Sequence, residues 1–137
     1  MKRTIKFRGY NLKNNKWIYG YYLVNRGQHF VVEDGIANPQ ATWKDFLVEE
    51  DTIGQYTGLI DKNGKEIYEG DVVITKQFGK IVKRGQDILN VSGEDCFVIK
   101  YINAQFMFDK HSRSFYLHRN INCEVIGNIY HNGKEKE

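Results

Sequence analysis

The sequence is poor in the residues that mark several common classes of protein. It has a single proline and only two cysteines, Cys96 and Cys123, among 137 residues. Two cysteines cannot build a disulfide scaffold, and a chain of this length buries a core without one. No stretch approaches about 18 consecutive apolar residues, and the basic N-terminus lacks the apolar run of a signal peptide. We therefore expect a globular, cytoplasmic protein with reduced thiols and no membrane partner.

Motifs for catalysis, metal binding and phosphate binding are also scarce. There is no Cys-x-x-Cys pair, no His-Glu-x-x-His motif, no Gly-x-Ser-x-Gly elbow and no Gly-rich phosphate loop. The block 61–66 begins like a calcium loop, but Lys65 stands where the fifth, oxygen-bearing ligand is needed. Glu66 and Glu69 do not share a face of a straight strand, and Asp71 is expected to accept hydrogen bonds from backbone amides at a turn. The sequence therefore predicts no enzyme, no metal site and no cofactor.

Aromatic residues and glycines are plentiful instead. Aromatic residues make up 14% of the chain, with nine Tyr and eight Phe, and there are 13 Gly. Aromatic and β-branched residues favour strands, and glycines favour the turns between them. Short apolar or alternating runs, separated by turn signals every ~8–12 residues, predict a mostly β protein, α+β at most. The predicted strands cover residues 5–8, 17–24, 29–32, 52–56, 65–68, 72–75, 79–83, 88–91, 96–102, 105–108, 115–117 and 123–130.

Local signals place the turns and divide the chain. Asn14-Asn15 and Asn63-Gly64 favour positive φ, and Asn25-Arg26-Gly27 and Ser92-Gly93 predict further turns. The run 42–45, Thr-Trp-Lys-Asp, resembles a capping box and predicts a single helical turn. We expect an N-terminal β-hairpin layer over residues 1–50, a small SH3-like β-barrel over residues 51–132 and a frayed charged tail over residues 133–137.

Charge is unevenly distributed along the chain. The net charge is only +3, but residues 33–71 carry ten acids against three bases, whereas residues 1–16 carry six bases and no acid. This alternation predicts a dipolar surface that attracts a charged partner or a second copy. Basic residues beside aromatic ones are also typical of nucleic-acid-binding surfaces on small barrels. The candidate nucleic-acid-binding residues are Lys2, Arg3, Lys6, Arg8, Lys76, Lys80, Lys83 and Arg84.

The aromatic-rich strand 17–24 predicts self-association. Its apolar residues stand at consecutive positions, so both faces of the strand are apolar. We expect one face to pack on the core and the other on a neighbouring subunit. Two alternatives stay open: a nucleic-acid-binding accessory protein, and a hydrolase or nuclease in which a cleft joins the carboxylates of residues 66–71 to His111 or His118.

Four segments resemble the YopX family of bacteriophages and prophages. Residues 5–8 read Ile-Lys-Phe-Arg, residues 52–59 Thr-Ile-Gly-Gln-Tyr-Thr-Gly-Leu, residues 61–73 Asp-Lys-Asn-Gly-Lys-Glu-Ile-Tyr-Glu-Gly-Asp-Val-Val and residues 124–130 Glu-Val-Ile-Gly-Asn-Ile-Tyr. The chain departs from the pattern at residues 9–11, where the family has Ala-Trp-Asp, and at Gly133, where it has Pro. The resemblance implies a β-rich fold with a barrel-like C-terminal part, self-association, and an unknown phage or host protein as partner. It implies no reaction and no catalytic residues.

Overall fold

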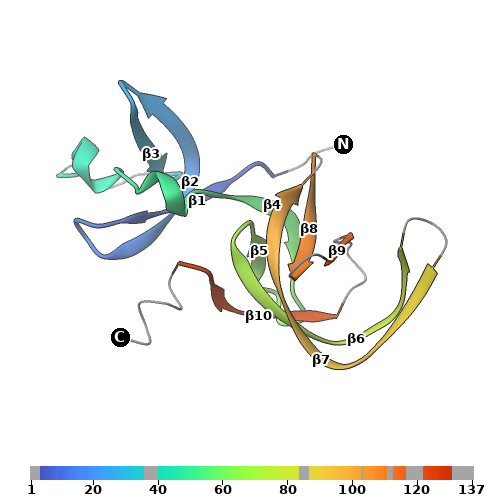
Figure 1. Cartoon of the computed structure of the whole chain (residues 1–137). Coiled ribbons are helices and arrows are strands. Elements are labelled where there is room, and N and C mark those ends of the chain that lie inside the picture. The colour runs from blue at the N-terminus through green and yellow to red at the C-terminus, as the bar shows by residue number, and fades with distance from the viewer. Residues whose placement is uncertain are drawn as a thin grey trace. The chain divides into compact units, whose positions relative to one another are not determined.

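A computed structural model confirms that the protein is mostly β (Figure 1). The structure describes residues 4–35, 40–83, 87–102, 104–110, 113–116 and 122–130, and only the backbone at residues 76–83, 87–95, 110 and 113–116. It divides into two compact units, Met1–Gly58 and Leu59–Glu137. The predicted division into subdomains 1–50 and 51–132 stays a prediction, and the predicted tail lies outside the described residues.

The first unit is built on a meander of antiparallel strands. Its elements are β1 (Phe7–Asn11), β2 (Lys16–Asn25), β3 (Gln28–Val32), the 3-10 helices η1 (Trp43–Asp45) and η2 (Glu50–Thr52), and the beginning of β4 (Gly54–Ile60). The hydrogen-bonded order is β3-β2-β1-β4. Asn15 takes the predicted positive φ at the first turn, and the predicted second turn is present, with positive φ at Arg26 and Gly27. The single turn of η1 confirms the helical turn that the capping-box pattern predicts.

β2 changes its partner half-way along, and a glycine stands at the change. Lys16 to Gly20 pair with β1, whereas Tyr21 to Asn25 pair with β3. A Cβ atom on Gly20 would lie 2.0 Å from the carbonyl oxygen of Val32, so no other residue fits there without a backbone shift. β2 and β3 contribute Ile18 and Val31 to a small core that Val48 completes.

The second unit holds the long strands. Its elements are β5 (Glu66–Tyr68), β6 (Asp71–Lys83), β7 (Asp87–Ile102), β8 (Gln105–Lys110), β9 (Arg113–Tyr116) and β10 (Cys123–Asn128). Five of them form an antiparallel sheet in the order β10-β6-β7-β8-β9. Its core consists of buried apolar residues from β5, β6, β7, β8 and β10: Ile67, Val73, Phe97, Ile99, Phe108, Cys123 and Val125.

Asp61 organises the turn before β5 and the outer edge of β10. One carboxylate oxygen accepts hydrogen bonds from the backbone amides of Asn63 and Lys65 at 2.8 and 2.9 Å, and the other accepts one from Val125 at 2.9 Å. Burial by itself would raise the pKa of Asp61, but these three amides outweigh it and hold the pKa below 3.8. The Asp-x-Asn-Gly block is therefore a structural turn in which the Asp61 carboxylate accepts backbone amides. It resembles a calcium loop only at its start.

Three sequence predictions need correction or remain open. The predicted turn at Ser92-Gly93 is wrong, because β7 runs through it from Asp87 to Ile102, and register shifts near Gln77 in β6 absorb the irregularity. Cys96 is exposed, whereas its apolar surroundings in the sequence predicted a buried side chain. Over the described residues both sheets are open, with edge strands at each end of their order, so closure into an SH3-like barrel is not confirmed.

Candidate functional site

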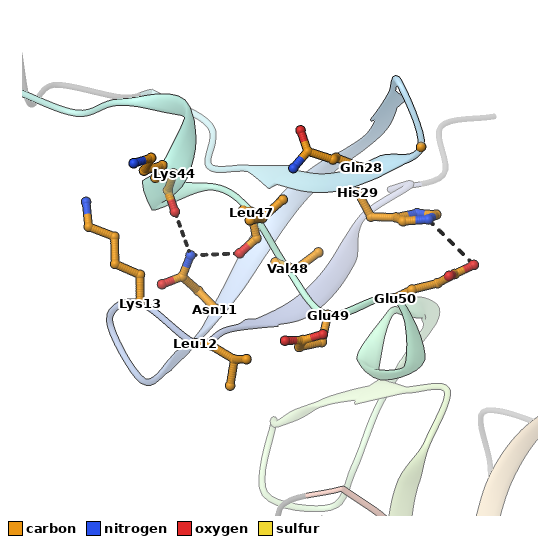
Figure 2. Close-up of a pocket in the computed structure, with 11 residues that line it drawn as sticks. Asn11, Leu12, Lys13, Gln28, His29, Lys44, Leu47, Val48, Glu49 and Glu50 are labelled. Atoms are coloured by element: carbon orange, nitrogen blue, oxygen red, sulfur yellow. Dashed lines mark hydrogen bonds and ion pairs between the residues drawn. The ribbon is translucent and has the colours of Figure 1, made fainter.

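A pocket of about 330 Å³ opens in the first unit (Figure 2). It lies between the β1–β2 turn, the start of β3 and the segment that runs from η1 to η2. Its volume falls at the lower end of the range that is usual for small-molecule sites. The lining residues are Asn11, Leu12, Lys13, Gly27, Gln28, His29, Lys44, Leu47, Val48, Glu49 and Glu50.

The backbone on either side of the pocket is fixed by hydrogen bonds between distant segments. The amide of Val48 donates to the carbonyl of His29 at 3.0 Å, and the amide of Val31 donates to Phe46 at 3.0 Å. The amide of Glu49 donates to Tyr10 of β1, also at 3.0 Å. The segment 46–49 therefore covers the outer edge of β3 and ties it to β1, so the wall of the pocket is regular backbone.

Asn11 holds the opposite wall together. Its side chain is almost fully buried, and Nδ2 donates to the carbonyl oxygens of Lys44 at 3.1 Å and Leu47 at 2.7 Å (Figure 2). Its Oδ1 accepts the amide of Asn14 at 2.7 Å. Both hydrogens of the side-chain amide and its oxygen are engaged, so Asn11 shapes the pocket and does not offer itself to a ligand.

One end of the pocket carries Lys13 and Lys44, and the charge of Lys13 is paired with Asp45. Lys13 Nζ lies 2.8 Å from Asp45 Oδ1, and the other carboxylate oxygen accepts the amide of Thr42 at 2.8 Å. The hydrogen bond from Lys13, followed by those from Thr42 and Asn14, holds the pKa of Asp45 well below its usual range. Asp45 therefore stays ionised at any ordinary pH and keeps the ammonium group of Lys13 at this end.

The other end carries His29 and two carboxylates. His29 Nε2 lies 3.5 Å from Glu50 Oε2, and Nδ1 lies 2.7 Å from the hydroxyl of Tyr22. A hydrogen on Nε2 facing the carboxylate leaves Nδ1 to accept the tyrosine hydroxyl hydrogen. The two rings are also nearly parallel, 10° apart, so Tyr22 fixes the orientation of the imidazole. Glu50 itself is 73% exposed, as expected of a group that is open to solvent and to a ligand.

The carboxylate that faces His29 is exposed to solvent. A nucleophile needs a neighbouring base that a third group holds in place. Here the third group would be Glu50, which faces His29 on the side opposite to the hydroxyl of Tyr22. Glu50 is mostly exposed, so solvent screens its interaction with His29. In the part of the chain that the structure describes, no group of three His, Cys, Asp or Glu side chains is placed to hold a metal ion. The pocket combines an ion pair at one end, an imidazole beside a carboxylate at the other, and apolar surface from Leu47.

The structure gives an uneven account of the candidate nucleic-acid-binding residues. Lys6 Nζ lies 5.4 Å above the ring of Tyr56. Arg8 is only 4% exposed, and its guanidinium group lies 4.8 Å from the ring of Trp17, which argues against the predicted contact between Arg8 and a phosphate. Lys2, Arg3 and Arg84 lie outside the described residues, as do the side chains of Lys76, Lys80 and Lys83.

The carboxylates of residues 66–71 have structural partners. Asp71 Oδ2 accepts the backbone amide of Tyr68 at 2.7 Å, which confirms the turn predicted for it, and Gly70 takes the positive φ expected there. Glu66 Oε1 accepts the hydroxyl of Tyr68 at 2.9 Å. His111, which a hydrolase would need, lies outside the described residues, and so does His118.

Sequence reasoning did not find the pocket. Its walls come from three segments, 11–13, 27–29 and 44–50, and the sequence gave only local signals there, the turn at Arg26-Gly27 and the capping-box pattern of residues 42–45. Asn11 lies between the predicted strands 5–8 and 17–24. No pattern shows that its side chain bonds to carbonyls more than 30 positions away.

Comparison with known proteins identifies the family. The model of the YopX family, described as YopX protein, matches residues 6–134. The chain belongs to the YopX family. A search among curated proteins found no match. Among solved structures, this YopX protein is similar to the crystal structure of protein EF1440 from Enterococcus faecalis, with 22% sequence identity, a TM-score of 0.54, and coverage of 99% of this chain and 100% of that one.

At this identity the likeness shows the fold alone. The family assignment confirms the resemblance carried by the four segments 5–8, 52–59, 61–73 and 124–130. In addition, none of the helices among the described residues of this YopX protein has the length and apolar character needed to cross a membrane.

Proposed function

We propose that this YopX protein is a non-enzymatic binding or accessory module, encoded by a phage or prophage, that works in the cytoplasm of the bacterial host and self-associates. It takes no cofactor, and it brings its own copies together with a phage or host protein. The observation that carries the proposal is a row of exposed apolar side chains on one face of β2.

The row consists of Tyr19, Tyr21 and Leu23. These residues alternate along β2, so they project from the same face, and they are 44%, 57% and 44% exposed. Ile18, one position out of phase, is buried in the core of the first unit. The strand therefore uses one face for the core and leaves the other apolar face in contact with solvent, as the consecutive apolar residues of its sequence predict.

The size of the row suits a weak contact between copies. A tyrosine side chain presents about 150–250 Å² of surface, so two half-exposed tyrosines and Leu23 leave roughly 300 Å² of apolar surface in one strip. Patches of about this size on a monomer often have a function. A symmetric pair of strips would bury roughly twice that area, and the surrounding polar rim would bring the contact toward the lower limit of specific interfaces, about 1,200 Å².

Sedimentation velocity tests the proposal with three proteins. The unaltered chain should sediment with an average mass that rises above the monomer mass of 16.1 kDa as its concentration increases through the micromolar range. The double variant Tyr19→Ser/Tyr21→Ser should stay monomeric, because the aromatic strip is lost. The control Tyr101→Ser, which alters a tyrosine 53% exposed in the second unit, should behave like the unaltered chain.

Two results would refute this assignment. One is a strict monomer for the unaltered chain. The other is an equal loss of association in the double variant and in the Tyr101 control, which would show that the strip on β2 is not the contact.

A nucleic-acid-binding accessory function is the second candidate. The observation in its favour is the ammonium group of Lys6, which lies above the ring of Tyr56. A basic group beside an aromatic ring is typical of surfaces that bind single-stranded nucleic acid. Binding of this kind weakens steeply with salt, since phosphate contacts release counterions. Fluorescence anisotropy with a single-stranded oligonucleotide should then show weaker binding for Lys6→Gln and a strong salt dependence, and flat isotherms at low salt would dispose of this function.

A further inference from the structure

The pocket of the first unit separates its charges. Figure 2 shows Lys13 and Lys44 at one side of the pocket, and His29 and Glu50 at the opposite side. Leu47 lies between the two groups and presents apolar surface. A ligand that satisfies both ends must therefore carry a negative group and a positive group with an apolar middle.

The charged groups at the two ends differ in how they are held. Lys13 is anchored by Asp45 at 2.8 Å but is still 51% exposed, so two of its three ammonium hydrogens are available to a carboxylate. Glu50 has His29 at 3.5 Å and is 73% exposed, and Glu49 beside it is exposed as well. The basic end is positioned in advance, whereas the acidic end is adaptable.

The volume limits the size of the ligand. About 330 Å³ corresponds to the space of roughly ten water-sized groups, since one water molecule occupies about 30 Å³. An α-amino acid is smaller than this, and it carries both charges on one carbon, so it cannot span the apolar middle of the pocket. A dipeptide has about the right number of atoms and separates its two charges by a peptide unit and a side chain.

We infer that this pocket binds a zwitterion of dipeptide size, with its carboxylate at Lys13, its ammonium group at Glu50 and Glu49, and an apolar side chain against Leu47 and Val48. The walls that meet the ligand are fixed beforehand by Asn11 and by the backbone bonds of the segment 46–49, so little ordering is needed on binding. The inference is independent of self-association, because the pocket and the strip on β2 share no residue.

A titration followed by ¹⁵N–¹H NMR of the full chain tests the inference, with the dipeptide Ala-Leu as the probe. Saturable shifts are expected at the amides of residues 11–13, 28–29 and 44–50, with a dissociation constant of about 1 mM, as befits a ligand of about 14 non-hydrogen atoms at modest efficiency. Two blocked forms, N-acetyl-Ala-Leu and Ala-Leu amide, should each bind about threefold more weakly or worse, since each lacks one charge.

Variants assign the two ends. Glu50→Gln should weaken Ala-Leu about threefold but leave N-acetyl-Ala-Leu unaffected, because that form has no ammonium group for Glu50 to meet. Lys13→Met should weaken Ala-Leu about threefold but leave Ala-Leu amide unaffected, because that form has no carboxylate for Lys13 to meet. Glu33→Gln is the matched control, since it removes an exposed carboxylate of the same unit outside the pocket.

The spectra also show whether each variant is folded. Glu50 is mostly solvent-exposed, so its variant keeps the test valid even if Lys13→Met loses structure with its partner Asp45. The inference is overturned if no saturable shift occurs up to about 10 mM dipeptide, about ten times the expected dissociation constant. It is equally overturned if the shifts lie elsewhere, or if blocking either end leaves the affinity unchanged.

Discussion

Removal of the Asp61 carboxylate should destabilise the second unit more than any other single change of a charged side chain discussed above. Asp61 is 5% exposed and accepts three backbone amides, from Asn63, Lys65 and Val125. The Val125 amide belongs to β10 and is buried, so water cannot replace the carboxylate there. The substitutions to compare are Asp61→Ala, which removes all acceptors, and Asp61→Asn, which keeps the shape and one oxygen.

The size of the effect follows from the burial of each amide. A buried donor that loses its partner costs about 1–3 kcal/mol, and the two half-exposed amides of the turn cost less because water reaches them. We expect Asp61→Ala to lower the free energy of unfolding by about 3–5 kcal/mol, and Asp61→Asn by about 2–3 kcal/mol, since the amide side chain presents one donor where an acceptor is needed.

Urea unfolding followed by far-UV circular dichroism measures the effect. Tryptophan fluorescence alone does not suffice, because both tryptophans, Trp17 and Trp43, lie in the first unit. Hydrogen exchange at the Val125 amide locates the change, and exchange there should accelerate in both Asp61 variants. Glu124→Gln is the control: its ion pair with Lys62 is 3.5 Å long and solvent-exposed, so its loss should cost less than about 1 kcal/mol.

The stability that the Asp61 carboxylate contributes should also depend on pH. Because the pKa of Asp61 is lower in the folded chain than its ordinary value of 3.8, ionisation contributes stability above that value, and the contribution is lost as the pH falls through the folded pKa. The gap in stability between the unaltered chain and Asp61→Asn should therefore narrow below about pH 4. The reasoning is refuted if Asp61→Ala costs less than about 1 kcal/mol, or if the gap is constant with pH.

Three further changes test other parts of the structure. Gly20→Ala should unfold the first unit or lower its stability by several kcal/mol, because the new methyl group meets the Val32 carbonyl. Tryptophan fluorescence reports this, and a cost below about 1 kcal/mol would contradict the close approach of Gly20 to Val32. Thr52→Val should cost about 1–2 kcal/mol in the same assay, since it removes the acceptor of a buried backbone amide, and an unchanged stability would be at odds with that bond. With Ellman's reagent the exposed Cys96 should react at once, whereas the buried Cys123 should react only on unfolding. Burial, with a smaller effect from the nearby Asp61 charge, raises the pKa of Cys123 to about 11. Two equally fast thiols would disprove the burial of Cys123.

Local signals in the sequence predicted most strands and turns correctly. Asn15, Gly64 and Gly70 all take the positive φ that their residue types favour, and the alternating or apolar runs lie on strands. The failure at Ser92-Gly93 has a physical cause: Gly93 lies at a register shift inside a long two-stranded ribbon, where Ser92 and Asp95 still pair with β6, and a single sequence does not show the partner strand.

The candidate site was harder to predict because it depends on contacts between distant positions. Asn11 bonds to carbonyls 33 and 36 positions away, and the wall of the pocket depends on the backbone bond between Val48 and His29. Arg8 is another residue whose surroundings in the fold could not be predicted from the sequence. A basic residue near the start of the chain reads as a surface group, but in the fold its guanidinium group is buried against Trp17.

The most direct test of the whole account is the solution mass of the unaltered full chain, measured by sedimentation equilibrium at several loading concentrations. The account predicts a mass that climbs from near 16.1 kDa toward twice that value or more as the concentration rises, with the steepest change in the micromolar range. A mass that stays at 16.1 kDa at every concentration would contradict it, because the apolar face of β2 would then have no second copy to cover it.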